Sequence, residues 1–229
     1  MTEAARLDAI LRASPRLMRV LAIARDLDLP DWRIVSGAVY QTVWNALTGR
    51  EPDYGIKDFD LFYFDGSDLS YEAAAALPPD LAPVVEVRNQ ARVHLWFEGH
   101  FGEPYAPLAC TDEAIARFVS ASCAVGVRLE PDGRLDVAAP YGLADIFALT
   151  FRANPTRPLA QGWSKVTQSA KARWPELTIV SPSANPPARF GSAGASDNLH
   201  RGLCGVRQDS RHDAQALAQD GDVGDAAEA

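Results

Sequence analysis

The chain of 229 residues contains few cysteines, the residues that stabilise small folds through disulfides or bound zinc. It contains three cysteines, an odd number at wide spacing, and no CxxC pair. This pattern supports neither a disulfide framework nor a zinc knuckle, and it is typical of a reducing compartment. Stability must come from a hydrophobic core, for which a chain of this length with 47% apolar residues has enough material.

Long apolar segments and excess positive charge are also missing. No stretch approaches the roughly 18 consecutive apolar residues of a membrane span, and acidic residues precede the first apolar run, unlike a secretory signal. The formal net charge of -8 argues against a broad surface for the nucleic-acid backbone, although it permits one local basic groove. We therefore predict a soluble cytoplasmic protein without bulk DNA binding.

Hydrophobic periodicity and turn residues predict an α/β or α+β domain over residues 1–180, with flanking helices on a mixed, twisted β-sheet. The expected strands cover 33–35, 57–65, the segment from Val84, and a hairpin within 124–140. The expected helices follow Ser14, the Ser36-Gly37 turn, Ser70, Asn89, Thr111 as a cap, Tyr141 (ending before Pro155) and Gly162 (ending at Trp174). Residues 181–229 are dense in Ser, Pro, Gly, Ala and Asn without apolar periodicity, so we predict a disordered low-complexity tail.

Two acidic residues one position apart stand at the entrance to an aromatic strand, in "KDFDLFYFD". Alternate residues of a strand point to the same face, so Asp58 and Asp60 would lie side by side and repel each other. A hard divalent cation such as Mg²⁺ relieves that repulsion. The competing interpretation is a solvated loop that leads into a strand.

Two further features favour a binding site. Gly37 lies where a strand turns into a helix, a place at which a phosphate can approach backbone N–H groups. Glu86 lies between two valines on an expected strand, where burying an unpaired charge is costly, so a metal ion or a basic partner is implied. The alternative is that Glu86 lies on the solvent-exposed face of the strand. Arg88 and Arg92 follow closely and predict a phosphate or acceptor patch, or else surface salt bridges. Trp44, Trp96, Trp163 and Trp174 are expected in the core.

The stretches "VSGAVYQTVW", "KDFDLFYF" and "VVEVRNQ" together resemble the DNA polymerase beta superfamily of nucleotidyltransferases. The longer stretches "VRNQARVHLW", "AVGVRL" and "APYGLADIFALTFRANP" are similar to a bacterial nucleotidyltransferase-like family of unknown substrate. The resemblance spans roughly Arg33 to Pro175 and implies a polymerase-beta-like core.

By this resemblance the site has two parts. Asp58, Asp60 and Glu86 are the metal carboxylates, and Ser36, Gly37 and Ala38 form the triphosphate-binding turn, with Arg88 and Arg92 nearby. The implied activity moves a nucleoside monophosphate from a nucleoside triphosphate to an unidentified hydroxyl acceptor, with Mg²⁺ or Mn²⁺. Relatives usually have Gly-Ser or Gly-Gly at the turn, whereas here Ala38 follows Gly37. The alternative is therefore an inactive nucleotide-binding or partner-binding module on the same fold.

Overall fold

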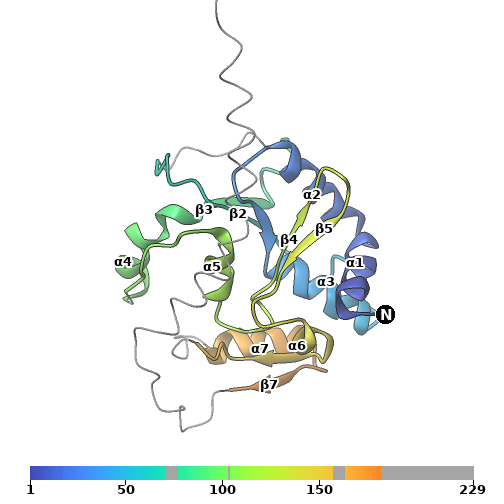
Figure 1. The fold of residues 1–229 in the computed structure, drawn as a ribbon. Helices are drawn as coiled ribbons and strands as arrows, with labels where there is room; N and C mark the ends of the chain where they lie inside the picture. The colour runs from blue at the N-terminus through green and yellow to red at the C-terminus, as the bar shows by residue number, and fades with distance from the viewer. Residues whose placement is uncertain (71–76, 103, 157–162, 182–229) are drawn as a thin grey trace, which may run out of the picture. The chain divides into compact units, whose positions relative to one another are not determined.

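The computed structural model describes residues 1–70, 77–102, 104–156 and 163–181, and in them helices surround a five-stranded mixed sheet (Figure 1). The helices are α1 (Glu3–Arg12), α2 (Pro15–Asp26), α3 (Gly37–Leu47), the 3-10 helix η1 (Gln90–Leu95), α4 (Phe97–Phe101), α5 (Thr111–Ala116), α6 (Ala144–Phe147) and α7 (Trp163–Arg173). The strands are β1 (Arg33–Val35), β2 (Phe59–Tyr63), β3 (Val85–Asn89), β4 (Gly126–Leu129), β5 (Leu135–Ala138), β6 (Thr150–Arg152) and β7 (Thr178–Val180). The predicted α/β class and the mixed sheet are confirmed. Among the described helices, none has the length and apolarity to cross a membrane.

The strand order β3-β2-β1-β4-β5 brings the end of β1 beside the starts of β2 and β3. Strand β2 runs parallel to β3 and antiparallel to β1, and β1 is also antiparallel to β4. In this register Val35 lies opposite Asp60 on one side, and Glu86 lies opposite Asp60 on the other. One end of the sheet therefore gathers the β1–α3 turn and the acidic residues.

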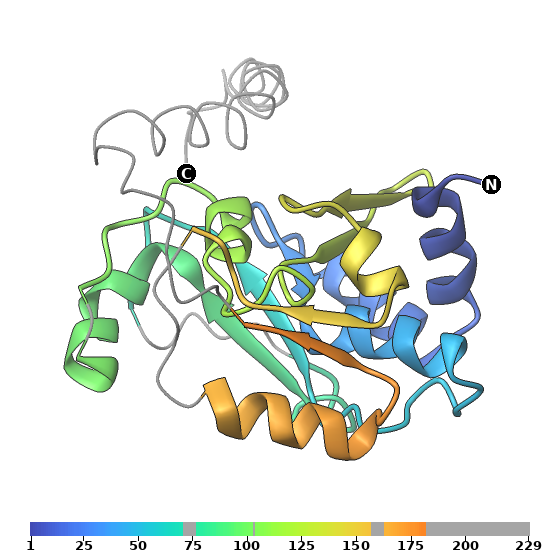
Figure 2. The ribbon, with the colours of Figure 1, turned by 90° about the horizontal axis from the view of Figure 1, so that it is seen from below.

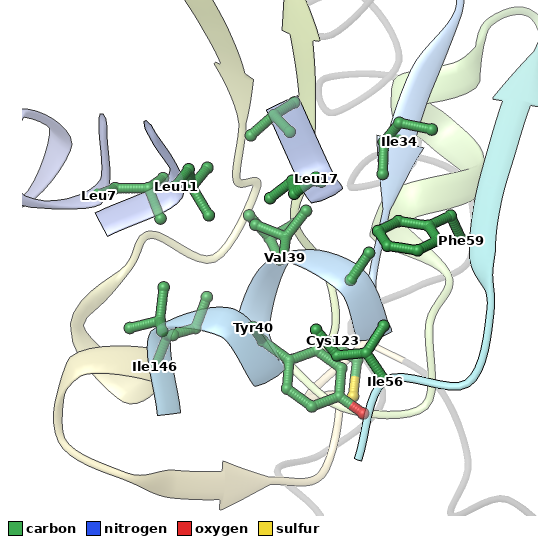
Figure 3. Packing of buried hydrophobic residues seen from close by; sticks show 14 of the residues in the cluster. Leu7, Leu11, Leu17, Ile34, Val39, Tyr40, Ile56, Phe59, Cys123 and Ile146 are labelled. Atoms are coloured by element: carbon green, nitrogen blue, oxygen red, sulfur yellow. The ribbon is translucent and has the colours of Figure 1, made fainter. Parts of the chain in front are cut away.

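One face of the sheet carries the main core. Helices α2 and α3 contact it, because their apolar residues recur at helical spacing while β2 alternates buried and half-buried residues. Ser14 caps α2 as predicted, since its hydroxyl accepts a hydrogen bond from the Leu17 N–H. Figure 3 shows α3 carrying Val39 and Tyr40 between the leucines of α1 and the sheet residues Ile34 and Phe59. This packing fixes the direction in which α3 leaves the turn.

The opposite face of the sheet is covered in part by α5. Ile115 of α5 packs with Val35 in a second, smaller apolar cluster. The approach is close, because a Cβ at Gly126 would lie 2.7 Å from Ile115 Cδ1 and 3.1 Å from Arg33 Cδ. Glycine at residue 126 is therefore required for α5 to reach the sheet. Asp60 and Glu86 share this face, since Asp60 lies opposite Val35 and Glu86 lies opposite Asp60 in the register.

The C-terminal elements include a tryptophan that packs against α3. Strands β6 and β7 pair in parallel, and α7 precedes β7 (Figure 2). Trp174 is fully buried, its ring lies 5.5 Å from that of Trp44, and its indole N–H donates to Asn45 Oδ1 at 2.9 Å. Asn45 in turn donates to the carbonyls of Pro52 and Tyr54. The segment that leads from α3 to Asp58 is therefore held by Asn45, which Trp174, the residue after α7, fixes in place.

Three local predictions need correction. Thr111 is the first residue of α5 rather than its cap, and its hydroxyl donates to the Asp31 carbonyl. The helix expected from Tyr141 to before Pro155 is short, because Leu149 takes a positive φ of 49° and the chain continues as β6. Trp96 is 44% exposed, whereas the other tryptophans expected in the core are buried.

Two predictions concern residues that the structure does not describe. The helix expected over Ser70 to Leu77 falls mainly on residues 71–76, and the low-complexity tail falls on residues 182–229. Both remain predictions from the sequence.

Candidate active site

The turn between β1 and α3 has an unusual backbone. Ser36 has φ 52° and ψ -114°, a conformation that glycine adopts easily and that a Cβ makes costly. The conformation is fixed on both sides, since the Ser36 N–H donates to the Val125 carbonyl and the Ser36 carbonyl accepts from Val39 and Tyr40. The N–H groups of Gly37 and Ala38, in the first turn of the helix, consequently lie at its positive end.

The structure refines the predicted triphosphate-binding turn. Ser36, rather than Gly37, has the glycine-like conformation, and Gly37 is the residue that follows it. Ala38 is 1% exposed and its methyl group belongs to the core, so only its backbone N–H is available to a ligand. A hydroxyl at residue 38 would therefore point into the core.

Replacing Ser36 with glycine should stabilise the protein by about 1 kcal/mol, because the left-handed conformation costs a residue with a Cβ roughly 1–3 kcal/mol and glycine loses part of that gain to its unfolded-state entropy. Ser36→Ala keeps the Cβ and is the matched control, for which no gain is expected. Thermal unfolding of both variants measures the difference. A Ser36→Gly protein less stable than Ser36→Ala would contradict the strained turn.

The buried thiol of Cys123 lies next to the turn. Cys123 is buried, and burial raises the pKa of its thiol to about 12, although contacts with Tyr40, Ser120 and Ser36 act in the opposite direction. Figure 3 shows the Tyr40 hydroxyl directed to the Cys123 sulfur. The thiol is therefore protonated and structural, and it contacts the residue that forms the turn.

Asp60 is the central carboxylate of the site. It lies on β2 between Val35 of β1 and Glu86 of β3, one strand position after the entry residue Phe59. Burial, then the charges of Asp58 and Glu86, raise the pKa of Asp60 to about 6, while Arg88 partly offsets them. Asp58 and Glu86 thus both act electrostatically on Asp60, as neighbouring like charges do. The sequence prediction that the β2 and β3 strands are neighbours is confirmed.

Glu86 is directed to Arg88, two residues further along the same strand. A Glu86 carboxylate oxygen accepts from Arg88 Nη2 at 2.8 Å, and both side chains are about half exposed. Such a pair contributes little stability and is easily exchanged for another partner. Within the described ranges no three His, Cys, Asp or Glu side chains are already grouped tightly enough to hold a metal ion.

The two predicted arginines are placed differently. Arg88 lies opposite Phe62 on β2, on the same face as Asp60 and Glu86. Arg92 lies on η1, and its charge acts on Tyr63, at the end of β2 away from the turn. Three residues of strand, about 10 Å, separate Tyr63 from Asp60. The register brings Arg88, but not Arg92, to the carboxylates.

Two residues near the turn were not predicted from the sequence. Gln41 is buried on α3, and its amide nitrogen lies 3.0 Å from the place of a Cβ on Gly37. Arg173, at the end of α7, donates from Nη1 to Gln41 Oε1 at 3.3 Å and to the Gly55 carbonyl at 3.0 Å. The sequence carries no local signal for a contact between residues 132 positions apart.

The fold and this end of the sheet define the class of protein. Residues 22–179 match the family described as nucleotidyltransferase, so the chain belongs to that family. A solved NMR structure described as revealing a CCA-adding enzyme head domain is similar, with 28% identity, a TM-score of 0.61, and coverage of 76% of this chain and 95% of the other. No curated protein shows significant similarity to the chain. The nucleotidyltransferase class implied by the sequence resemblance is thereby confirmed.

Proposed function

We propose that the protein transfers a nucleoside monophosphate from a nucleoside triphosphate to a hydroxyl acceptor, with a divalent cation as cofactor. The observation that carries the proposal is the register of Asp60, which lies opposite Glu86 on one strand and opposite Val35, the last residue before the Ser36-Gly37 turn, on the other. A phosphate group bound at the turn is thereby adjacent to the carboxylates. The proposed setting is the cytoplasm, as the sequence predicts.

The proposed roles follow from the positions of the residues. The N–H groups of Gly37 and Ala38, with the Ser36 hydroxyl at the same turn, bind the triphosphate at the positive end of α3. Asp58, Asp60 and Glu86 would hold the divalent cation beside the reacting α-phosphate and the acceptor hydroxyl, and Glu86 assists removal of the acceptor proton. Arg88 supplies positive charge on the same face. Arg92 stays a predicted phosphate contact, reachable only by a ligand that extends along β3.

The carboxylates fit a hard cation by their chemistry. Asp58, Asp60 and Glu86 offer only oxygen ligands, which Mg²⁺ and Mn²⁺ prefer. The pKa of Asp60 is raised first by burial and then by the charges of Asp58 and Glu86, and a cation would relieve this charge repulsion. Bound divalent ions neutralise charge that develops on the attacking and leaving oxygens of such a displacement. For Glu86 to contribute, its carboxylate must turn away from Arg88, which costs little for an exposed pair.

The activity test is a screen of the full chain with labelled ribonucleoside triphosphates, Mg²⁺ or Mn²⁺, and fractionated metabolites, RNA and protein as acceptors. Release of pyrophosphate with a labelled adduct is the expected result. The adduct identifies the acceptor, which the sequence does not specify. Nucleotide binding without turnover across all fractions would favour the alternative of an inactive binding module.

Magnesium should raise the melting temperature of the wild-type protein. At a concentration 100 times the dissociation constant, linkage adds about 2.7 kcal/mol, or roughly 5–10 °C for a domain of this size. Glu86→Gln should blunt this rise. The control is Glu130→Gln, because Glu130 also pairs with an arginine two residues away on a strand, Arg128. Equal magnesium responses of Glu86→Gln and wild type would remove Glu86 from the cation site.

A further inference from the structure

Arg173 joins the two segments that enter the candidate site. Its Nη1 group donates to the Gly55 carbonyl, three residues before Asp58, and to Gln41 on α3. Its guanidinium carbon lies over the Trp174 ring, 4.7 Å from the ring centre, a favourable cation–π contact. Figure 2 shows the end of α7 beside the residues that lead into β2.

Gln41 connects Arg173 with the turn. Gln41 is one helical turn after Gly37, and its amide nitrogen approaches the position that a side chain on Gly37 would fill. Residue 37 has no side chain, so the Gln41 amide lies directly over the first turn of α3. The Arg173 guanidinium lies next to this amide, with its Nη1 at 3.3 Å from Gln41 Oε1.

We infer that Arg173 binds the β- and γ-phosphates of the nucleoside triphosphate and that Gln41 is the residue that positions it. The inference rests on the proposed nucleotidyl transfer. The α-phosphorus must lie beside the carboxylates, so the remaining phosphates extend along the positive end of α3 toward Gln41. A guanidinium binds phosphate oxygens with paired N–H groups. None of the described residues accepts a hydrogen bond from Arg173 Nη2, the group left for the ligand.

The experiment measures nucleotide affinity of the full chain with Mg²⁺ for wild type, Arg173→Gln and Arg173→Lys. The probes are whichever of ATP, GTP, CTP and UTP wild type binds most tightly, and its di- and monophosphate. Arg173→Gln should weaken triphosphate binding about 10- to 100-fold, the range for a lost charged hydrogen bond, with a smaller effect for the diphosphate and almost none for the monophosphate. Arg173→Lys should restore part of the loss.

Arg50→Gln is the matched control, because Arg50 has a similar structural role without facing the turn. Its guanidinium lies 5.6 Å from the Tyr54 ring and pairs with Glu176 at 3.0 Å, so it also ties the 50–55 segment to the residues after α7. We expect Arg50→Gln to lower stability about as much as Arg173→Gln while leaving triphosphate affinity unchanged. If Arg173→Gln does not fold, Arg173→Lys takes its place. The ratio of its affinity for the triphosphate to its affinity for the monophosphate is then compared with the same ratio for wild type.

The outcomes separate the inference from the proposed function. Equal weakening of tri- and monophosphate binding would mean that Arg173 only holds the Gly55 segment, and an unchanged triphosphate affinity would likewise overturn the inference while leaving nucleotidyl transfer intact. Absence of any triphosphate binding by wild type would overturn the proposed function and this inference with it.

Discussion

Asp60→Asn is expected to lower nucleotidyl transfer by roughly 10²–10³-fold or more, the loss typical of removing one group that stabilises charge in a transition state. Asp60 is the carboxylate between the other two acids and the β1–α3 turn, so its amide removes the ligand at the centre of the site. The amide has the same shape, and the fold should be retained. Single-turnover transfer with the acceptor found by the screen measures the effect, and Asp53→Asn, at an exposed residue before the site, is the control.

The same substitution should make the protein more stable above pH 7 in the absence of divalent cations. The folded-state pKa of Asp60 is raised from 3.8 to about 6, so the folded protein binds this proton more tightly than the unfolded chain does. The resulting stabilisation is complete below pH 3.8 and is lost as pH rises through 6. Asparagine avoids the charged form altogether, so its advantage over wild type is on the order of 2 kcal/mol at pH 8 and vanishes near pH 4.

Thermal unfolding from pH 4 to 8 checks this prediction, with an expected rise in melting temperature of roughly 4–8 °C at pH 8. A gain in stability that accompanies lost transfer is the signature of a residue kept for function at the expense of stability. An Asp60→Asn protein that transfers nucleotide at the wild-type rate, or whose stability relative to wild type is independent of pH, would contradict the assigned role.

Much of the fold was predictable because its central elements obey local rules. Ser14 and Pro15 specify the start of α2, and a short run rich in aromatic residues, closed by Gly66-Ser67, specifies β2. The split of residues 141–154 into α6 and β6 was not predictable in this way. It depends on the positive φ of Leu149 and on pairing of β6 with β7, a strand whose residues lie nearly thirty positions later.

In the candidate site, too, some residues were predictable from local sequence patterns and others were not. Asp58, Asp60 and Glu86 were predicted because acidic residues at the entrance to a strand or within one are chemically conspicuous. The register confirms that Asp60 and Glu86 are neighbours, whereas Asp58 is exposed and lies just before the start of β2. The backbone of Ser36 was missed because serine gives no sequence signal for a positive φ. Arg173 and Gln41 meet only through the packing of α7 against α3, which no local pattern encodes.

Arg33→Met is expected to destabilise the protein by about 3–5 kcal/mol, the usual cost of removing one partner from a buried ion pair. Arg33 is 1% exposed on the face of β1 that it shares with Val35. Its Nε donates to Asp112 at 2.7 Å and its Nη2 donates to Asp136 at 2.9 Å. Methionine fills the space but removes the charge that neutralises both carboxylates. Burial already raises the pKa of Asp112, and Arg33 is the main group that opposes the shift.

The deficit of Arg33→Met should be largest at neutral and alkaline pH. Without the guanidinium the pKa of Asp112, which burial already raises, loses the group that opposes the rise, so the folded variant binds this proton more tightly than the unfolded chain. Its stability therefore falls as pH rises and approaches that of wild type near pH 4. Arg152→Met is the control, since Arg152 pairs with Asp145 through two hydrogen bonds at the surface and should cost less than about 1 kcal/mol.

Adding Asp112→Asn to Arg33→Met separates charge from packing. If the cost arises from an uncompensated carboxylate, the double variant should recover part of the stability, because the amide carries no charge to bury. We expect the recovered stability to extend to the candidate site. Arg33 lies two residues before Val35, the register partner of Asp60, and Asp112 lies on α5 above the same face of the sheet. A double variant less stable than Arg33→Met, or a deficit that does not change with pH, would show that Arg33 acts through packing alone.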